Sequence, residues 1–338
     1  MLDAESRTGM SRLSREVRVI VPASTANLGP GFDSLGMALS IFAGVSMKEA
    51  EETKVYVYGE NLRDLPRDKS NLVYGVARKV FDRLGLTMPE LEIALESDIP
   101  LARGLGSSAA AIVGSLVAAN ELAGGLLSRD ELFQMAVAME NHPDNVGAAL
   151  FGGFVAAAWD GRRAEAVRLD PPANLEVLAA IPKYELATKK ARSVLPRQVS
   201  MEDAVFNVSH SSLLTAALAA GRLDVLRQAM RDRLHQPYRA AMIPGMEEVL
   251  AHATEHGALG AALSGAGPTL LMLAQADDPQ RAELESYVRQ TLEAAGVEVE
   301  TRWVKPCLHG AQIAVLETAG PPQPPLDAVR KAQRGVNV

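Results

Sequence analysis

Cysteine and long apolar segments are almost missing from this sequence. Its 338 residues include one cysteine, Cys307, which cannot form an internal disulfide. Because no neighbouring residue indicates an activated thiol, we expect Cys307 to be structural or at the surface. No run reaches the ~18 apolar residues of a membrane-spanning helix. Residues 1–15 are polar and charged, without the apolar core of a secretory signal, so the sequence predicts a cytoplasmic protein.

An excess of charge of one sign is missing as well. The 34 basic and 41 acidic residues give a net charge of −7 and are interspersed along the chain. This balance disfavours a general binder of nucleic acid or of membrane surfaces. An anionic substrate would therefore need a local group of arginines to hold it.

The length suits two domains, and the 48% apolar content can supply a core for each. Apolar runs and period-two alternation predict strands at residues 17–21, 54–58, 91–96, 175–181, 270–273, 297–304 and 312–316. Capping residues and helical spacing predict helices that begin near Ser70, Ser128, Ser200 and Asp278. We expect an N-terminal domain over residues 16–174, a C-terminal domain over residues 175–318, and flexible termini at residues 1–15 and 319–338.

The most informative segment is a glycine-rich loop, residues 100–111, that runs into an apolar helix. Gly104 and Gly106 permit a close approach of the backbone to a ligand, and Ser107 and Ser108 suit the N-cap position. The free N–H groups of a helix N-terminus attract phosphate. The loop has neither the lysine of a Walker A motif nor the third glycine of a dinucleotide fingerprint. An ordinary turn before a core helix is the alternative.

Two further segments are rich in glycine. Residues 22–36 follow the first strand, and we expect them to form an irregular loop. In that loop Asn27 and Asp33 either contact a polar ligand or cap the local backbone. Residues 257–269 contain a glycine-serine turn that precedes a strand, which is either a second anion-binding nest or a tight turn.

Taken together, these three segments resemble those of the GHMP kinases, the family of galactokinase, homoserine kinase, mevalonate kinase and phosphomevalonate kinase. Their order and separation match, and the resemblance spans about residues 17–316. It implies a two-domain α+β fold, with an N-terminal domain like that of ribosomal protein S5 and a ferredoxin-like C-terminal domain. ATP would lie between the two domains.

Within this family the resemblance is to the members that phosphorylate homoserine. It is carried by residues 27–33, 142–147 with 151–153, 186–192 and 236–239. The implied reaction transfers the γ-phosphoryl group of ATP to the hydroxyl of L-homoserine, on the pathway to threonine. The expected partners are ATP and L-homoserine, without nucleic acid or membrane, and a homodimer stays open.

The resemblance also implies roles for individual residues. The ATP site would comprise Asn71, Pro100, Leu101, Ala102, Arg103, Gly104, Leu105, Gly106, Ser107, Ser108, Ala109 and Ala110. The homoserine site would comprise Asn27, Asp33, His142, Asn145, Thr188, Arg192, Arg239 and Gly267, and the catalytic residues would be His142, Asp144, Asn145 and Arg192. A guanidinium fork suits the substrate carboxylate, and an aspartate suits the ammonium group.

The expected metal is Mg²⁺, held by Ser108 and Glu140. In some relatives the metal-binding glutamate lies further upstream of the histidine, but here that stretch holds Gln134 and Ala138. Glu140 is therefore the carboxylate expected to bind the metal. For the catalytic base three options stay open, namely Asp144, His142, or no dedicated base.

Two other functions compete with this reading. One is a kinase of the mevalonate-pathway type. The pair Arg192 and Arg239, taken with Asn27 and Asp33, argues against it, because this set suits an amino acid better than an isoprenoid precursor. The other is a non-catalytic relative that binds nucleotide as a regulatory module. The presence of Ser107, Ser108 and Glu140 argues against that alternative.

Overall fold

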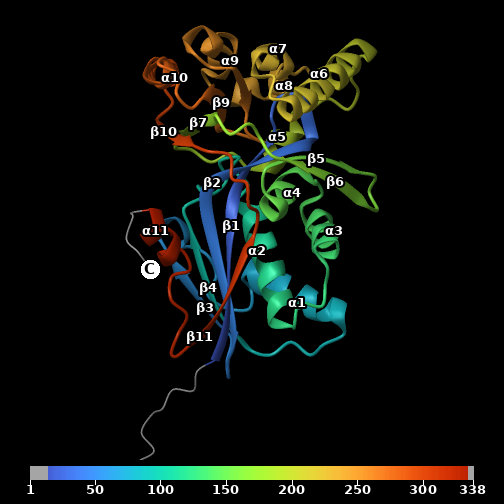
Figure 1. Cartoon of the computed structure of the whole chain (residues 1–338), viewed down its shortest axis with the longest axis vertical. Helices are drawn as coiled ribbons and strands as arrows, with labels where there is room; N and C mark the ends of the chain where they lie inside the picture. Colours follow the sequence, from blue (N-terminus) through green and yellow to red (C-terminus); the bar gives the residue numbers. More distant parts are fainter. Residues whose placement is uncertain (1–13, 334–338) are drawn as a thin grey trace, which may run out of the picture.

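This computed structural model describes residues 14–333, which fold into two sheets with helices packed on them (Figure 1). The strands are β1 (Ser14–Asn27), β2 (Gly31–Glu49), β3 (Lys54–Tyr58), β4 (Leu91–Ser97), β5 (Phe154–Trp159), β6 (Ala164–Leu169), β7 (Leu175–Pro182), β8 (Gly260–Leu263), β9 (Leu270–Gln275), β10 (Val299–Val304) and β11 (Gln312–Thr318). The helices are α1 (Leu72–Leu84), α2 (Ser107–Leu122), α3 (Arg129–Glu140), α4 (Asp144–Phe151), α5 (Thr188–Ser193), α6 (Met201–Ala220), α7 (Leu226–Ala229), α8 (Gln236–Arg239), α9 (Met246–His252), α10 (Arg281–Ala294) and α11 (Asp327–Gln333).

The larger sheet has the strand order β11-β1-β2-β4-β3, with β5 paired to β2 and β6 paired to β5. Figure 1 shows α1–α4 on one side of it and α11 on the other. Period-two alternation places Val17, Val19 and Val21 of β1 in the core, where all three are fully buried. Every residue of α2 from 112 to 120 is buried, because α2 packs against the sheet and against α1, α3 and α4. The uncharged sequence of α2 fits this position.

The smaller sheet is antiparallel, with the order β10-β7-β9-β8. Numbered along the chain, this order is 4-1-3-2, which confirms the ferredoxin-like arrangement expected for the second half. All residues of β7 are buried, because it lies inside the sheet and α10 packs on one of its faces. Leu284, Val288 and Leu292 of α10 enter the core at helical spacing.

The predicted helix starts at Ser128 and Ser200 are confirmed. Ser128 and Glu131 form the capping box at the start of α3, and the left-handed residue Asn141 ends that helix. Ser200 caps α6, and Gly221 ends it with φ +68°. Local side-chain chemistry alone sets these boundaries, so they can be read from the sequence.

Other predicted helix starts are wrong. Asn71 rather than Ser70 caps α1, since its Oδ1 accepts a hydrogen bond of 3.1 Å from the N–H of Val73. The N-cap of α2 is Gly106 with φ +70°, so neither serine of the loop occupies that position. Helix α10 begins at Arg281, after the turn that starts at Asp278.

The prediction of an irregular loop over residues 22–36 is also wrong. Strand β1 continues to Asn27, and β2 begins at Gly31 after a short turn. The ladder shifts register after Pro22 and again before Asn27. These irregularities accommodate a proline, which cannot donate to the ladder, and they bend the hairpin toward the second half of the chain.

The C-terminal segment returns to the larger sheet. Strand β11 pairs antiparallel with β1, with Val315 opposite Val17. Residues 175–318 therefore do not form one continuous unit, because their last strand completes the N-terminal sheet. The boundary expected between residues 174 and 175 remains a proposal, and β7, which follows it directly, belongs to the smaller sheet.

The expectation of a flexible segment from residue 319 onward is wrong as far as residue 333. Leu326 is fully buried, and Arg330 pairs with Glu96 and, at 2.7 Å, with Asp98. The hydroxyl of Tyr58 donates to the carbonyl of Pro322 at 2.6 Å. These contacts hold the segment against the sheet face opposite α1–α4. Ser14 and Arg15, also expected to be flexible, belong to β1 and pair with β11, so that part of the prediction is wrong as well. The rest of the expected flexible termini, residues 1–13 and 334–338, lie outside the described residues.

Two smaller expectations concern the membrane and the thiol. Within residues 14–333 no helix has the length and apolarity needed to cross a membrane. Cys307 is half-buried, and burial raises the pKa of its thiol. A raised pKa disfavours the reactive thiolate at neutral pH, in line with a structural role.

The burial of the C-terminal segment predicts an effect on stability. Leu326→Ala should lower the free energy of unfolding by about 2–5 kcal/mol, because it leaves a cavity in the core. Leu126→Ala is the matched control, since Leu126 is 62% exposed, and it should stay within about 0.5 kcal/mol of the parent. Urea denaturation measures both. Equal costs for the two variants would contradict the docking of this segment.

Candidate functional site

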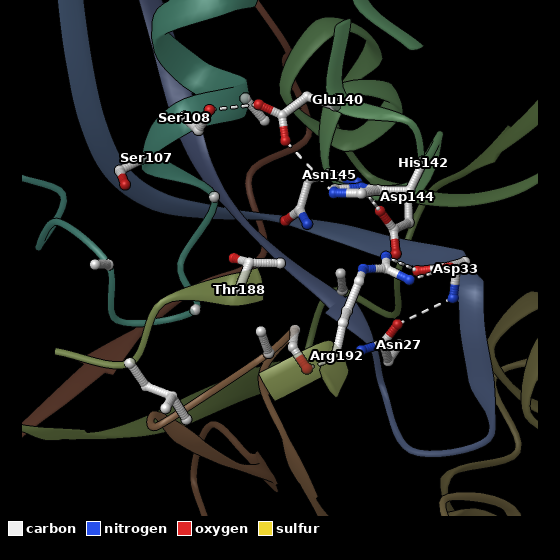
Figure 2. Close-up of a pocket in the computed structure, with 18 of the residues that line it drawn as sticks. Asn27, Asp33, Ser107, Ser108, Glu140, His142, Asp144, Asn145, Thr188 and Arg192 are labelled. Carbon is white, nitrogen blue, oxygen red and sulfur yellow. Dashed lines mark hydrogen bonds and ion pairs between the residues drawn. The ribbon is translucent and has the colours of Figure 1, made fainter. Parts of the chain in front are cut away.

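One cleft brings together most of the predicted site residues (Figure 2). It encloses about 250 Å³ between the β1–β2 hairpin, the glycine-rich loop before α2, the α3–α4 junction, α5 and α8. The predicted residues that line it are Asn27, Asp33, Ala102, Gly104, Gly106, Ser107, Ser108, Ala109, Glu140, His142, Asp144, Asn145, Thr188, Arg192 and Arg239. It is further lined by Ala26, Phe32, Leu186, Gly265 and Ala266, which the sequence did not single out.

Seven predicted residues lie outside this lining, namely Asn71, Pro100, Leu101, Arg103, Leu105, Ala110 and Gly267. The side chain of Asn71 caps α1 and donates to the carbonyl of Pro66 at 2.6 Å, so the structure gives it a local role. The guanidinium of Arg103 donates to backbone carbonyls of Leu101 and Lys183. Leu105 and Ala110 belong to the core. A Cβ on Gly267 would meet apolar side chains, so that position faces the interior.

The glycine-rich loop is held in a conformation that requires its glycines. Gly104 and Gly106 have φ +81° and +70°, in the left-handed region. A Cβ on Gly104 would overlap the carbonyl oxygen of Ser264, and one on Gly106 would overlap Oγ of Ser24. The loop is therefore packed tightly against both other glycine-rich segments, and it leads directly into the N-terminus of α2.

Hydrogen bonds join the three glycine-rich segments. Oγ of Ser264 donates to the Gly104 carbonyl at 2.6 Å and lies 3.0 Å from Oγ1 of Thr25. The amide of Asn27 donates to the Gly265 carbonyl at 2.8 Å, and its oxygen accepts from the N–H of Asp33 at 3.0 Å. Asn27 thus lines the cleft, and its side chain joins the nearby backbone at Asp33 to the distant backbone at Gly265.

Two residues predicted to bind the opposite charges of the substrate, its carboxylate and its ammonium group, form an ion pair with each other. Nη1 and Nη2 of Arg192 donate to the two carboxylate oxygens of Asp33 at 2.9 and 2.6 Å. This pairing raises the pKa of Arg192. Figure 2 shows Arg192 reaching from α5 across the cleft to Asp33 on the hairpin. The sequence did not indicate this pairing, because the two residues are 159 positions apart.

Arg239 is held differently. Its side chain is 1% exposed, and it donates to the carbonyls of Ala191 and Gly265 and to Nδ1 of His235, at distances of 2.9–3.1 Å. Among the described residues it forms no ion pair with a carboxylate, and none accepts a hydrogen bond from its Nη2. Burial and the charge of Arg192 lower the pKa of Arg239 to about 10, so it stays a cation at neutral pH.

The junction of α3 and α4 supplies a cluster of titratable groups. Glu140 ends α3, and Asp144 begins α4. Nδ1 of His142 lies 2.8 Å from Oδ1 of Asp144, and Nε2 lies 3.4 Å from Oε2 of Glu140. Burial lowers the pKa of His142, but the hydrogen bond to Asp144 and the nearby carboxylates outweigh it, so the pKa is raised. The imidazolium form therefore persists above the usual range of histidine.

The same junction meets the N-terminus of α2. Oγ of Ser108 donates to Oε1 of Glu140, which brings the two predicted metal ligands into contact. One carboxylate and one hydroxyl fit Mg²⁺, which binds few protein oxygens and takes its other ligands from phosphates and water. Within residues 14–333 no group of three or more histidine, cysteine or acidic side chains forms an all-protein metal cage. The donor set present thus suits a metal shared with a phosphate ligand.

Sequence reasoning missed several residues that shape the cleft. Oγ of Ser24 donates to Oδ1 of Asn145 at 2.9 Å. Phe32 lies within 5.5 Å of the guanidinium carbons of both Arg192 and Arg239, measured to the ring centroid. His235 is buried behind Arg239. The signal for the last two was their position beside residues already singled out, since Phe32 precedes Asp33 and His235 precedes the segment 236–239.

Comparisons with known proteins agree on the family. The profile of the GHMP kinases N terminal domain matches residues 71–153, and that of the GHMP kinases C terminal domain matches residues 214–294. A homoserine kinase from Moorella thermoacetica is 44% identical over 297 residues, which cover 87% of this chain and 99% of the relative. A homoserine kinase from Deinococcus radiodurans is 50% identical over 262 residues, covering 78% of this chain and 85% of the relative.

A solved structure agrees as well. The crystal structure of homoserine kinase from Cytophaga hutchinsonii superposes with a TM-score of 0.79 at 28% sequence identity. The match covers 93% of this chain and 100% of that chain. The two-domain α+β arrangement is therefore shared along nearly the whole length.

The raised pKa of His142 predicts how stability depends on pH. An imidazolium favoured by the fold stabilises it fully below the unfolded-state pKa of about 6.5. This stabilisation is lost as the pH rises through the higher folded-state pKa. In His142→Gln, the decline of the unfolding free energy above pH ~6.5 should be shallower. Urea denaturation across this range measures the slope, and the exposed His252→Gln serves as control. Identical slopes for the parent and His142→Gln would contradict the assignment.

Proposed function

The chain belongs to the family of GHMP kinases, and we propose that it transfers the γ-phosphoryl group of ATP to the hydroxyl of L-homoserine. The product, O-phospho-L-homoserine, lies on the pathway to threonine, and the cytoplasm is the proposed compartment. One observation carries the choice of an anionic acceptor. Arg239 is a buried guanidinium that lines the cleft and has no carboxylate partner among the described residues.

The carboxylate of the substrate supplies the charge that Arg239 lacks. A guanidinium offers parallel N–H groups that match a carboxylate, and each charge-assisted bond is worth about 1.5–3 kcal/mol. The charge of Arg192 is already balanced by Asp33 at 2.6 Å. In this proposal Asp33 also receives the ammonium group of the substrate, while Arg192 keeps that carboxylate in place. Thr188 and Asn145, across the cleft, contact the rest of the substrate.

The triphosphate lies at the N-terminus of α2. A 16-residue helix presents free N–H groups and the positive end of its dipole there, and the glycines of the loop allow a close approach. Ser107 and Ser108 open this helix and line the cleft, so their hydroxyls add donors toward the phosphates. The phosphates and the substrate hydroxyl thus converge in one cleft, as transfer requires.

Ser108 and Glu140 would hold the magnesium ion. When bound, Mg²⁺ neutralises charge on the β- and γ-phosphates. Glu140 is suited to this role by its position, since it ends α3 beside the N-terminus of α2 and contacts Ser108 there. The protein supplies the remaining electrostatic stabilisation through the backbone N–H groups of the loop.

The geometry disfavours His142 as the base that accepts the proton of the substrate hydroxyl. Both nitrogens of its ring face carboxylate oxygens, and its raised pKa favours the imidazolium, which has no lone pair to accept a proton. Asp144, which is almost fully buried beside it, stays a candidate. A reaction without a dedicated base also stays open, because the loose transition state of phosphoryl transfer needs little early proton removal.

The proposed substrate predicts a selective kinase reaction. With Mg²⁺ and ATP, the protein should form ADP when L-homoserine is present and leave mevalonate and galactose unchanged. A coupled ADP assay measures this, with phosphorylated product identified by mass spectrometry. Faster turnover of mevalonate than of homoserine would contradict the proposal, and ATP binding without any turnover would indicate a non-catalytic relative.

The proposed metal site predicts the effect of Glu140→Gln, which keeps the shape of the side chain and removes its charge. We expect kcat to fall about 10²-fold, corresponding to ~3 kcal/mol of lost charge stabilisation. The increase in Tm that ATP causes in the presence of Mg²⁺ should also shrink. Glu121→Gln, at the opposite end of α2, is the control. Normal activity and an unchanged Mg²⁺ dependence in Glu140→Gln would place the metal ligand elsewhere.

A further inference from the structure

A fully buried histidine lies directly behind the cleft and has no part in the proposed chemistry. His235 has no exposed surface and precedes α8, the helix that carries Arg239. Its ring stacks on Phe32, with the ring centroids 5.2 Å apart and the planes inclined by 27°. Nε2 lies 2.7 Å from the carbonyl oxygen of Gly29, and Nδ1 lies 3.1 Å from Nη1 of Arg239.

These partners determine the protonation of the ring. The Gly29 carbonyl can only accept a hydrogen bond, so Nε2 carries the proton. The guanidinium of Arg239 can only donate, so Nδ1 presents its lone pair. Burial lowers the pKa of His235, and with the charge of Arg239 it outweighs the opposing charge of Asp232, whose Oδ2 lies 3.6 Å from Nε2; this agrees with a neutral ring. His235 is therefore an acceptor for Arg239 and a donor to the hairpin at the same time.

The backbone of His235 is held as firmly as its ring. Oδ2 of Asp232 accepts from the N–H groups of His235 and Gln236 at 3.0 and 2.7 Å. Oδ1 of Asp232 accepts from the amide of Asn207 on α6 at 2.7 Å. With its main chain anchored and its ring between Phe32 and Arg239, the side chain has little freedom to adopt another rotamer.

We propose that His235 is a positioning residue for the substrate carboxylate, a role that rests on the proposed homoserine kinase activity. It sets the plane of the Arg239 guanidinium relative to the hairpin, because one ring contacts both. Gly29 lies in the turn of the hairpin that carries Asp33, the group assigned to the ammonium. His235 thereby couples the two groups that bind the charged end of the substrate.

Loss of this support should weaken the binding of the substrate carboxylate and leave the binding of ATP unchanged. Without an acceptor at Nδ1, the guanidinium of Arg239 keeps only its hydrogen bonds to the carbonyls of Ala191 and Gly265, at 3.1 and 2.9 Å, so its plane is held less firmly. A planar donor fork binds a carboxylate well only in a narrow range of orientations. The binding of ATP, which lies at the α2 end of the cleft, does not depend on this orientation.

Two substitutions separate the two functions of the ring. His235→Asn can place an amide oxygen near the position of Nδ1 and so keeps the acceptor for Arg239. His235→Gln places its amide near Nε2 and keeps only the donor to Gly29. We expect His235→Gln to raise KM for L-homoserine by about tenfold or more, with KM for ATP within about twofold of the parent. His235→Asn should stay within about threefold for both substrates.

A substrate analogue supplies a further readout. For an amino alcohol that lacks the carboxylate, KM should be raised in the parent and should change little in His235→Gln, since no carboxylate meets Arg239. His256→Gln is the matched control, because His256 also stacks on an aromatic ring, that of Tyr287 at 3.9 Å, but lies outside the cleft. An equal rise of KM for homoserine and for the analogue in His235→Gln would overturn the proposal, as would no change for either.

A spectroscopic measurement keeps the proposal testable if the variants do not fold. In ¹⁵N NMR of the parent protein, His235 should show a neutral ring with a slowly exchanging proton on Nε2. A proton on Nδ1, or a doubly protonated ring at neutral pH, would overturn the assignment. This measurement needs no turnover, so it is independent of the proposed function. A parent protein that fails to phosphorylate homoserine would instead refute the function itself.

Discussion

The hydrogen bond from the Asn27 amide to the Gly265 carbonyl is the contact on which the cleft depends. It joins segments 238 positions apart at a distance of 2.8 Å, and the same amide accepts from the N–H of Asp33. Through it, the hairpin of the first half meets the glycine loop of the second half. Ser264 extends this junction to the glycine-rich loop before α2, because its hydroxyl donates to the carbonyl of Gly104. Side chain-to-backbone contacts therefore join all three glycine-rich segments around the cleft.

The charged groups of the cleft are paired with one another except at Arg239, where an anionic ligand would supply the missing partner. Asp33 neutralises Arg192, and the carboxylates of Glu140 and Asp144 surround His142. Arg239 alone among these groups has only neutral partners in the described chain. A buried cation without a counterion is costly, and an anionic substrate offsets that cost. In the proposed function, this asymmetry favours the substrate carboxylate at one end of the cleft, while the N-terminus of α2 receives the phosphates at the other.

The last strand of the described chain completes the sheet that its first strand begins. Strand β11 pairs with β1, and the segment beyond it packs on the sheet face opposite α1–α4, with Leu326 buried and Arg330 paired to Glu96 (Figure 1). The smaller sheet is thus inserted between parts of the larger one. The chain therefore passes between the two sheets twice, from β6 to β7 and from β10 to β11.

The sequence by itself determined the features that depend on near neighbours. Alternating valines predicted β1, the Ser128–Glu131 capping box predicted the start of α3, and the glycines of residues 100–111 predicted a tight loop before α2. Most residues of the cleft could be named as well, because they lie in short motifs that resemble a known family. Only the tertiary structure decided that Arg192 pairs with Asp33, that His235 contacts the hairpin at Gly29, and that residues after 318 dock on the sheet. These contacts join residues far apart in the chain, and such pairs leave no periodicity or local capping pattern in the sequence.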